Sequence, residues 1–118
     1  MHAFDVLGDP VRRRMLELLA DGEHTAGELT DVVRREFGVT QPAVSRHLRI
    51  LRESGFAVAR PEGTRRLYAV GGGAFREVDA WLQRYRRFWT QRLDAIETEV
   101  ARGRRDRATD ERATEEEQ

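Results

Sequence analysis

Near Gly55 the spacing of apolar residues changes from that of a helix to that of strands. In the segment before it, residues 40–54, the apolar residues Val44, Leu48 and Leu51 follow one another at i, i+4 and i+7. This spacing places them in one narrow stripe on a helix, which one side of the helix can bury. An amphipathic helix must therefore be followed directly by extended chain.

The extended chain has the pattern of a β-hairpin. Two short segments, residues 56–60 and 66–70, flank the sequence PEGT at 61–64. Proline fixes the first corner of a turn, and glycine accepts the positive φ that tight turns need. We predict a hairpin over residues 57–70.

Upstream, the sequence predicts two further helices and a short helical segment over residues 3–7. Asp9 is a helix cap, and Pro10 suits the first helical position. Thr25 and Glu28 have the spacing of a capping box, which opens the second helix. The predicted order is helix, helix, helix, hairpin and long helix, which is a mainly α winged helix-turn-helix fold with a small β-hairpin wing.

The long C-terminal helix is predicted to begin at Ala74, after three consecutive glycines at 71–73. Its apolar residues recur at intervals of three and four, close to a heptad repeat, and form an apolar seam. An exposed seam of this kind requires a partner chain. We therefore predict dimerisation through Phe75, Val78, Leu82, Tyr85, Trp89, Leu93 and Ile96. Trp81, Tyr85, Phe88 and Trp89 could instead line an effector pocket, but we favour the dimer core.

Composition limits the remaining possibilities. With 118 residues, 39% hydrophobic and 36% charged, the chain has room for one domain with a thin core. It has no cysteine, no apolar run long enough to cross a bilayer and no apolar signal segment. We expect a cytoplasmic protein with no membrane partner.

Charge is segregated along the chain although its formal sum is zero. Residues 40–70 contain six arginines and two acidic residues, whereas residues 106–118 contain two arginines and six acidic residues. A local basic surface attracts a phosphate backbone whatever the whole-chain charge is. We predict a domain over residues 1–103 and a disordered charged tail over 104–118.

The side of helix 40–54 opposite the apolar stripe carries the groups that read DNA. Arginine pairs with guanine, glutamine pairs with adenine, and serine bonds to a base or a phosphate. The alternative is an amphipathic surface helix with solvated arginines, but the arginines of the adjoining hairpin favour a wing on DNA. The residues that we predict to contact DNA are Thr40, Gln41, Ser45, Arg46, His47, Arg49, Arg60, Thr64, Arg65 and Arg66.

His47 and the arginine run at 12–14 can each be interpreted in two ways. His47 lies beside the apolar stripe, so a half-buried side chain bonded to local backbone is favoured over one that reaches a phosphate. The run Arg12-Arg13-Arg14 is interpreted as solvent-exposed, with one contact to DNA left open.

The segment VTQPAVSRHLRILRESGFAVARPEGTRRLYAV resembles the ArsR/SmtB family of bacterial repressors, as does LGDPVRRRMLELLADGEHTAGEL upstream. The resemblance covers about residues 4–103, and the S-R-H-L sequence with its wing is fairly specific. It implies a homodimeric repressor whose terminal helix builds much of the interface. It also implies base or phosphate contacts by Gln41, Ser45, Arg46 and Arg49.

The chain departs from the metal-sensing members that it resembles. Those members use cysteines near the recognition helix or a histidine-containing pattern on the last helix, and this chain has neither. Asp94 and Glu97 on the last helix have no nitrogen ligand beside them. We predict no metal site and no cofactor, and any small-molecule effector is unknown.

The residues predict a dimeric protein that binds an inverted repeat of double-stranded DNA through helix 40–54 and wing 57–70, and the resemblance implies that it is a repressor. One alternative is a winged-helix protein-interaction module without DNA binding, and another is a PadR-like or MarR-like regulator. An enzyme is not expected, because no catalytic set or phosphate-binding glycine loop is present.

Overall fold

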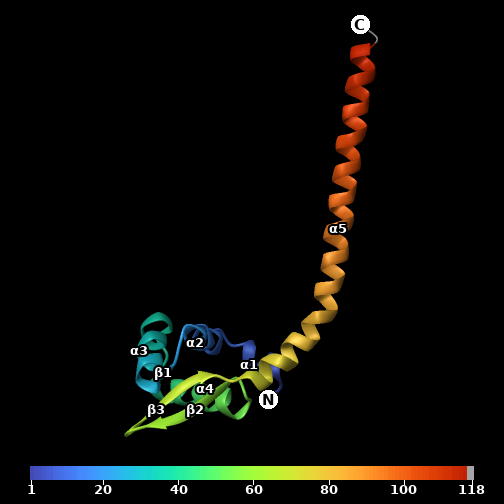
Figure 1. Ribbon diagram of the computed structural model, residues 1–118. Coiled ribbons are helices and arrows are strands. Elements are labelled where there is room, and N and C mark those ends of the chain that lie inside the picture. The colour runs from blue at the N-terminus through green and yellow to red at the C-terminus, as the bar shows by residue number, and fades with distance from the viewer. Residues whose placement is uncertain (117–118) are drawn as a thin grey trace. The chain divides into compact units, whose positions relative to one another are not determined.

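The computed structural model describes residues 1–116, and side chains through residue 110. These residues form two compact units, residues 1–80 and the part of α5 that begins at residue 81. The predicted fold class is confirmed, with helices, a small antiparallel sheet and a long C-terminal helix (Figure 1). The elements are α1 (Ala3–Leu7), α2 (Pro10–Ala20), β1 (His24–Thr25), α3 (Ala26–Phe37), α4 (Gln41–Glu53), β2 (Ala57–Glu62), β3 (Arg65–Val70) and α5 (Gly72–Glu116).

Side-chain caps define where the helices begin. The Asp9 carboxylate accepts hydrogen bonds from the backbone N–H groups of Val11 and Arg12 at 2.9 and 3.1 Å, in front of α2. Thr25 caps α3 and Thr40 caps α4 through their hydroxyl oxygens. These bonds satisfy N–H groups that the first turn of a helix leaves without partners. The predicted starts of α2, α3 and α4 are therefore confirmed.

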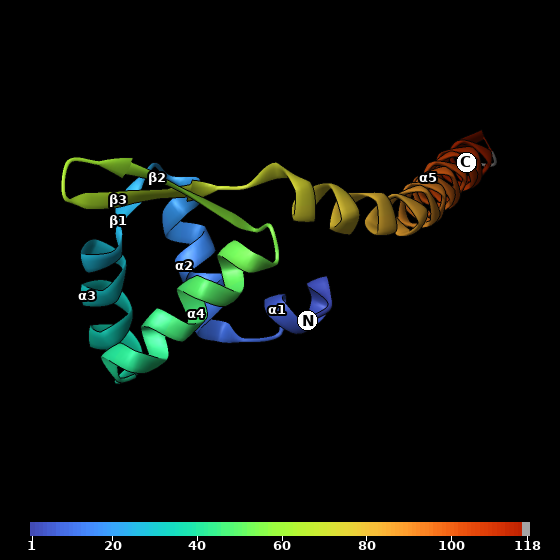
Figure 2. The ribbon, with the colours of Figure 1, turned by 90° about the horizontal axis from the view of Figure 1, so that it is seen from below.

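The sheet contains a strand that the sequence did not predict. Its order is β1-β3-β2, and β1 pairs with β3 through His24 opposite Tyr68 and Thr25 opposite Leu67. A strand of two residues carries no repeat that a sequence pattern can detect, so only the fold places it. The sheet packs along one side of helices α2, α3 and α4 (Figure 2).

The predicted hairpin is confirmed, with a shorter turn than expected. Strand pairing continues through Glu62 opposite Arg65, so only Gly63 and Thr64 remain in the turn. Gly63 has a φ of +60°, and among residues 1–116 only glycines have a positive φ. A positive φ at the first turn position alone is the pattern of a type II′ turn. Pro61 is tolerated in β2 because β2 is an edge strand.

The first unit has a small core made of the apolar faces of its helices and the start of the hairpin. Its fully buried side chains are Val6, Met15, Leu29, Val33, Val44, Leu51 and Phe56. Phe75, at the start of α5, packs edge to face on Phe56 with ring centroids 4.9 Å apart. Val78 is also packed against this core. Two residues predicted only as dimer contacts therefore hold the start of α5 on its own domain.

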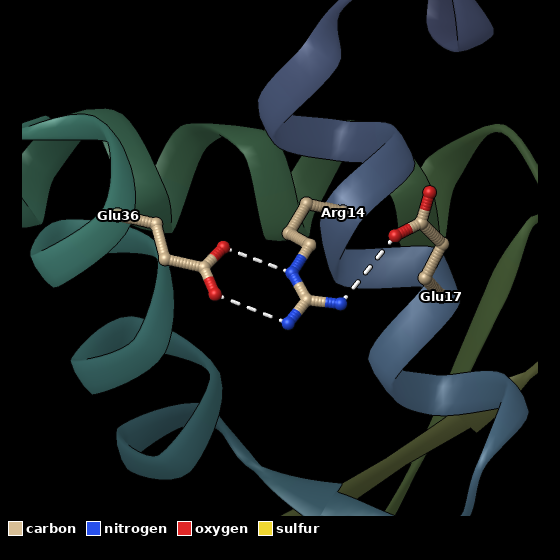
Figure 3. Close-up of polar contacts among 3 residues, drawn as sticks. All are labelled: Arg14, Glu17 and Glu36. Carbon is tan, nitrogen blue, oxygen red and sulfur yellow. Dashed lines mark hydrogen bonds and ion pairs between the residues drawn. The ribbon is translucent and has the colours of Figure 1, made fainter.

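Arg14 links two helices of the first unit. Its guanidinium donates from Nε and Nη2 to the carboxylate of Glu36 on α3, at 2.9 and 3.1 Å (Figure 3). It also donates to Glu17 within α2, at 3.4 Å. The hydrogen bond with Glu36 raises the pKa of Arg14 and lowers the pKa of Glu36. The expectation that Arg14 is simply solvated is therefore wrong.

Helix α5 is longer at both ends than the sequence analysis predicts. It begins at Gly72 instead of Ala74 and continues to Glu116, whereas a disordered tail was expected from residue 104. Arginine, alanine and glutamate are strong helix formers, so they continue a helix even where they bury nothing. The division into a domain and a tail at residue 103 stays a prediction.

Candidate nucleic-acid interface

Helix α4 has one buried side and one polar side. Val44, Leu48 and Leu51 are buried in the core, as the stripe on the helix predicts. The polar face consists of the exposed residues Gln41, Ser45, Arg46 and Arg49. Within the part of the chain that the structure describes, neither arginine of this face forms an ion pair. Their donors are therefore free to bond a ligand outside the protein.

Thr40 stands at the beginning of this face. Its hydroxyl accepts a hydrogen bond from the N–H of Ala43 at 3.3 Å and so starts α4. The turn before it depends on Gly38, which has the left-handed φ of +69°. The N-terminus of α4 thus follows α3 after a short connection, as in a helix-turn-helix.

The wing carries two of its three predicted arginines without an ion pair. Arg65 and Arg66 are exposed at the start of β3, beside the turn residue Thr64, and no ion pair is recorded for them in residues 1–110. The turn of the hairpin extends beyond the helices (Figures 1 and 2). A projecting strand pair with free guanidiniums can reach phosphates that the helices do not touch.

Arg60 differs from the other wing arginines because it has a partner within the protein. It donates to the two carboxylate oxygens of Glu23, at 2.8 and 3.4 Å. This hydrogen bond raises the pKa of Arg60 and lowers the pKa of Glu23. Arg60 therefore also ties β2 to the loop before β1, a role that the sequence analysis missed.

His47 is not part of the exposed face. Its side chain is only 8% exposed, and its Nδ1 atom lies 3.1 Å from Nη1 of Arg12. Arg12 is itself 7% exposed, so the expectation that it is solvated is wrong. The bond to a side chain on α2 also replaces the expected bond to local backbone. We therefore exclude His47 from the set of direct DNA contacts proposed below.

The part of α5 after residue 80 carries an apolar seam that faces solvent in the single chain. Trp89, Leu93 and Ile96 are 61%, 56% and 54% exposed, and Tyr85 is exposed as well. Leu82 is partly buried. Large apolar side chains are rarely left in contact with water in a row of this length. The seam is the surface on which a partner chain would gain the most apolar burial.

Two hollows in the first unit differ in chemistry. An open, apolar hollow of about 290 Å³ lies among Leu7, Leu16, Ala20 and Phe75, with charged residues at its rim. A second hollow of about 150 Å³ lies where Ser45 and Arg49 of the polar face adjoin the sheet. The first volume lies at the lower limit of pockets that hold drug-sized ligands, and the second lies well below that limit.

Residues 9–58 match the sequence model of the family described as "Bacterial regulatory protein, arsR family". A transcriptional regulator of the helix-turn-helix type from Mycobacterium tuberculosis is 37% identical over 91 residues, covering 77% of this chain and 78% of the relative. The chain belongs to the ArsR family. The family match covers the segment from the cap of α2 to the start of β2, and so includes the whole helix-turn-helix.

Two further proteins extend the comparison. A probable mercury resistance operon repressor from Streptomyces lividans is 37% identical over 68 residues, which is 58% of this chain and about half (51%) of that protein. The solution structure of a homodimeric winged helix-turn-helix DNA-binding domain from Mycobacterium bovis matches with a TM-score of 0.54 and 29% identity, covering 69% of this chain and 71% of that one. This likeness confirms the winged helix-turn-helix fold.

In the described part of the chain, two further observations concern membrane-spanning helices and metal-binding clusters of side chains. Among residues 1–116, no helix combines the length and the apolar composition of a bilayer span. Among the side chains that the structure describes, those of residues 1–110, no three histidine, aspartate or glutamate residues come together as ligands for a metal ion.

Proposed function

We propose that this member of the ArsR family is a homodimeric repressor that binds an inverted repeat of double-stranded DNA. The observation that carries the proposal is the polar face of α4, which is exposed while the opposite side of the same helix is buried. A recognition helix in a major groove requires this division, because one side must anchor the helix and the other must reach base edges.

The contacts differ in their roles. Arg46, Arg49 and Gln41 have the donors and acceptors that pair with base edges, and Ser45 reaches a base or a phosphate. Arg65 and Arg66 on the wing contact phosphate or the minor groove. The contacts proposed from Thr40, Arg60 and Thr64 are to the DNA backbone, where they position the protein without reading sequence.

The dimer places two copies of the polar face on one DNA molecule. The apolar seam of α5 supplies the interface, and the related domain from Mycobacterium bovis is homodimeric by its description. In a two-fold dimer, recognition helices enter successive major grooves about 10 base pairs apart. Repression is inferred from the family and from the name of the Streptomyces lividans relative.

The proposal is tested by selecting binding sites for the full-length protein from random and genomic DNA. The expected result is an enriched inverted repeat whose half-sites are about 10 base pairs apart. If no sequence is enriched and all duplexes bind equally weakly, sequence-specific binding is refuted and a protein-interaction module becomes the better reading.

The selected site then allows a test of the polar face. Arg49→Ala should weaken binding to it by about 1–3 kcal/mol and relax the preference at one base position. Arg102→Ala is the matched control, because it removes an exposed arginine of α5 that belongs to neither α4 nor the wing. Affinity is measured by fluorescence anisotropy at one fixed salt concentration. An equal loss for both variants would mean that only total charge matters.

A further inference from the structure

The buried guanidinium of Arg12 has only uncharged hydrogen-bonding partners in the described residues. Its Nε donates to the carbonyl oxygen of Val6 at 2.9 Å, and its Nη2 donates to the carbonyl oxygen of Asp5 at 3.0 Å. Its Nη1 lies 3.1 Å from Nδ1 of His47. The guanidinium therefore joins α1 and α2 to α4 at one point. No other side chain makes hydrogen bonds that connect these three helices in the described residues.

The bond to His47 determines which ring nitrogen carries the hydrogen. A guanidinium has donors only, so Nδ1 of His47 must accept and must carry no proton. The ring is then neutral, with its hydrogen on Nε2. Protonation of Nδ1 would remove the acceptor and place two cations 3.1 Å apart in a buried position.

The position of His47 on α4 connects this bond to the proposed interface. Arg46 is its neighbour in sequence, and Ser45 and Arg49 lie two residues away on either side. Because α4 is a rigid helix, a change in how His47 is held changes where all three of these side chains lie. A shift of about 1 Å is enough to lose well-placed contacts.

We propose that the buried Arg12–His47 hydrogen bond positions α4 for DNA recognition, so that protonation of His47 weakens specific binding. Both residues act as positioning residues and do not touch DNA. The inference depends on the proposed function, since its readout is the affinity for the selected DNA site.

Burial and the charged groups around His47 together favour the neutral ring. Burial lowers the pKa of His47, and the cations Arg12 on α2 and Arg46 on its own helix lower it further. Asp9, at the start of α2, acts in the opposite direction and raises it. The phosphates of bound DNA would, like Asp9, favour the protonated ring. This direct electrostatic effect alone would make binding tighter in acid, which is the opposite of the result we expect.

The experiment compares the dissociation constant (Kd) of the selected site at pH 7.5 and pH 5.5 for three full-length proteins. The wild-type protein should bind more weakly at pH 5.5, by less than about tenfold, because the lowered pKa of His47 leaves part of the rings neutral at that pH. H47Q keeps a side-chain oxygen that can accept from Arg12 but does not titrate. Its Kd should change by a smaller factor than the wild-type Kd between the two pH values.

H24Q is the matched control, because it removes a half-buried histidine of β1 that is paired with Glu28 and lies outside α4. It should keep the wild-type pH dependence. Circular dichroism at each pH checks that all three proteins are folded, so a loss of affinity is not a loss of structure. The ¹⁵N shifts of the His47 ring should show hydrogen on Nε2 and not on Nδ1 at pH 7.5.

Each outcome decides between the two proposals. If folded H47Q shows the same pH dependence as the wild type, or if the wild type binds equally well at both pH values, this inference is wrong while DNA recognition stands. Tighter binding of the wild type at pH 5.5 also overturns it. Failure of the wild type to bind any selected site at pH 7.5 overturns both proposals.

Discussion

At the scale of single residues, arginines with the same side chain have different roles because their surroundings differ. Arg12 is buried, Arg14 joins two helices through Glu36, and Arg60 is paired with Glu23. Arg49 and Arg65, in contrast, have no ion pair in the described residues and face solvent. Arginines of the last kind have all of their donors available for DNA, whereas Arg60 shares its guanidinium with Glu23.

This difference predicts a graded salt dependence within the wing. Arg65→Ala and Arg66→Ala should each reduce the slope of log affinity against log salt concentration by about 0.9, because each loses one phosphate contact. Arg60→Ala should reduce the slope by less, since its guanidinium is already paired with Glu23. The slopes are measured by fluorescence anisotropy on the selected DNA site. Equal slopes for wild type and the Arg65, Arg66 double variant would refute the assignment of the wing.

The buried His47 predicts that stability depends on pH. Its pKa is lowered in the folded protein, mainly by burial, whereas the unfolded value is about 6.5. The unfolded chain thus binds the proton more readily, so the free energy of unfolding should fall as pH drops from about 6.5 through the folded pKa. Above that interval the contribution is fully present. Urea unfolding at several pH values tests this, and H47Q should show a smaller decrease than wild type.

At the scale of elements, the junction between β3 and α5 depends on close backbone contact. Gly71 is buried, and a Cβ atom at this position would lie 2.7 Å from the carbonyl oxygen of Gly55. Gly55 itself has a φ of +83° and ends the turn after α4. Nothing lies within 4 Å of a Cβ atom at Gly73, two residues further on. The row of three glycines therefore combines one position that requires glycine with others that do not.

Two matched substitutions separate these positions. Gly71→Ala should lower the free energy of unfolding by about 1–3 kcal/mol, because the backbone must move to make room for the methyl group. Gly73→Ala should leave it unchanged or raise it by up to about 1 kcal/mol, since alanine favours a helix. Chemical unfolding measures both. If both variants had the same effect, the close contact with Gly55 would not be important for stability.

At the scale of the whole molecule, the surface that the single chain leaves most apolar is the seam of α5. Trp89 and Leu93 are more than half exposed, while the core of the first unit is small. A thin core and an uncovered seam together favour a protein that is stable as a dimer.

Dimerisation is tested by placing a charge in the seam. Leu93→Glu should weaken self-association by at least about tenfold, because the interface would bury an unpaired carboxylate. Gln91→Glu adds the same charge to α5 outside the seam, so it should associate like the wild type. Sedimentation velocity over a range of concentrations measures both. A monomeric wild-type protein, or equal association of the two variants, would contradict the predicted interface.

Much of the fold followed from local patterns alone. The caps at Asp9, Thr25 and Thr40 and the helix stripe through Leu48 depend on short-range sterics and hydrogen bonds, which a sequence displays directly. The hairpin was predicted for the same reason. The polar face of α4 was predicted because a helical wheel separates buried from exposed positions before any tertiary contact is known.

Other features depended on residues far apart in the chain. The sequence alone determined the order of elements, the hairpin and the polar face, because these arise from neighbouring residues. Only the tertiary structure decided that Arg12 meets His47, that Arg60 meets Glu23 and that β1 pairs with β3. Each of these contacts joins segments at least 35 residues apart, and no local pattern specifies which distant partner a buried or charged side chain will meet.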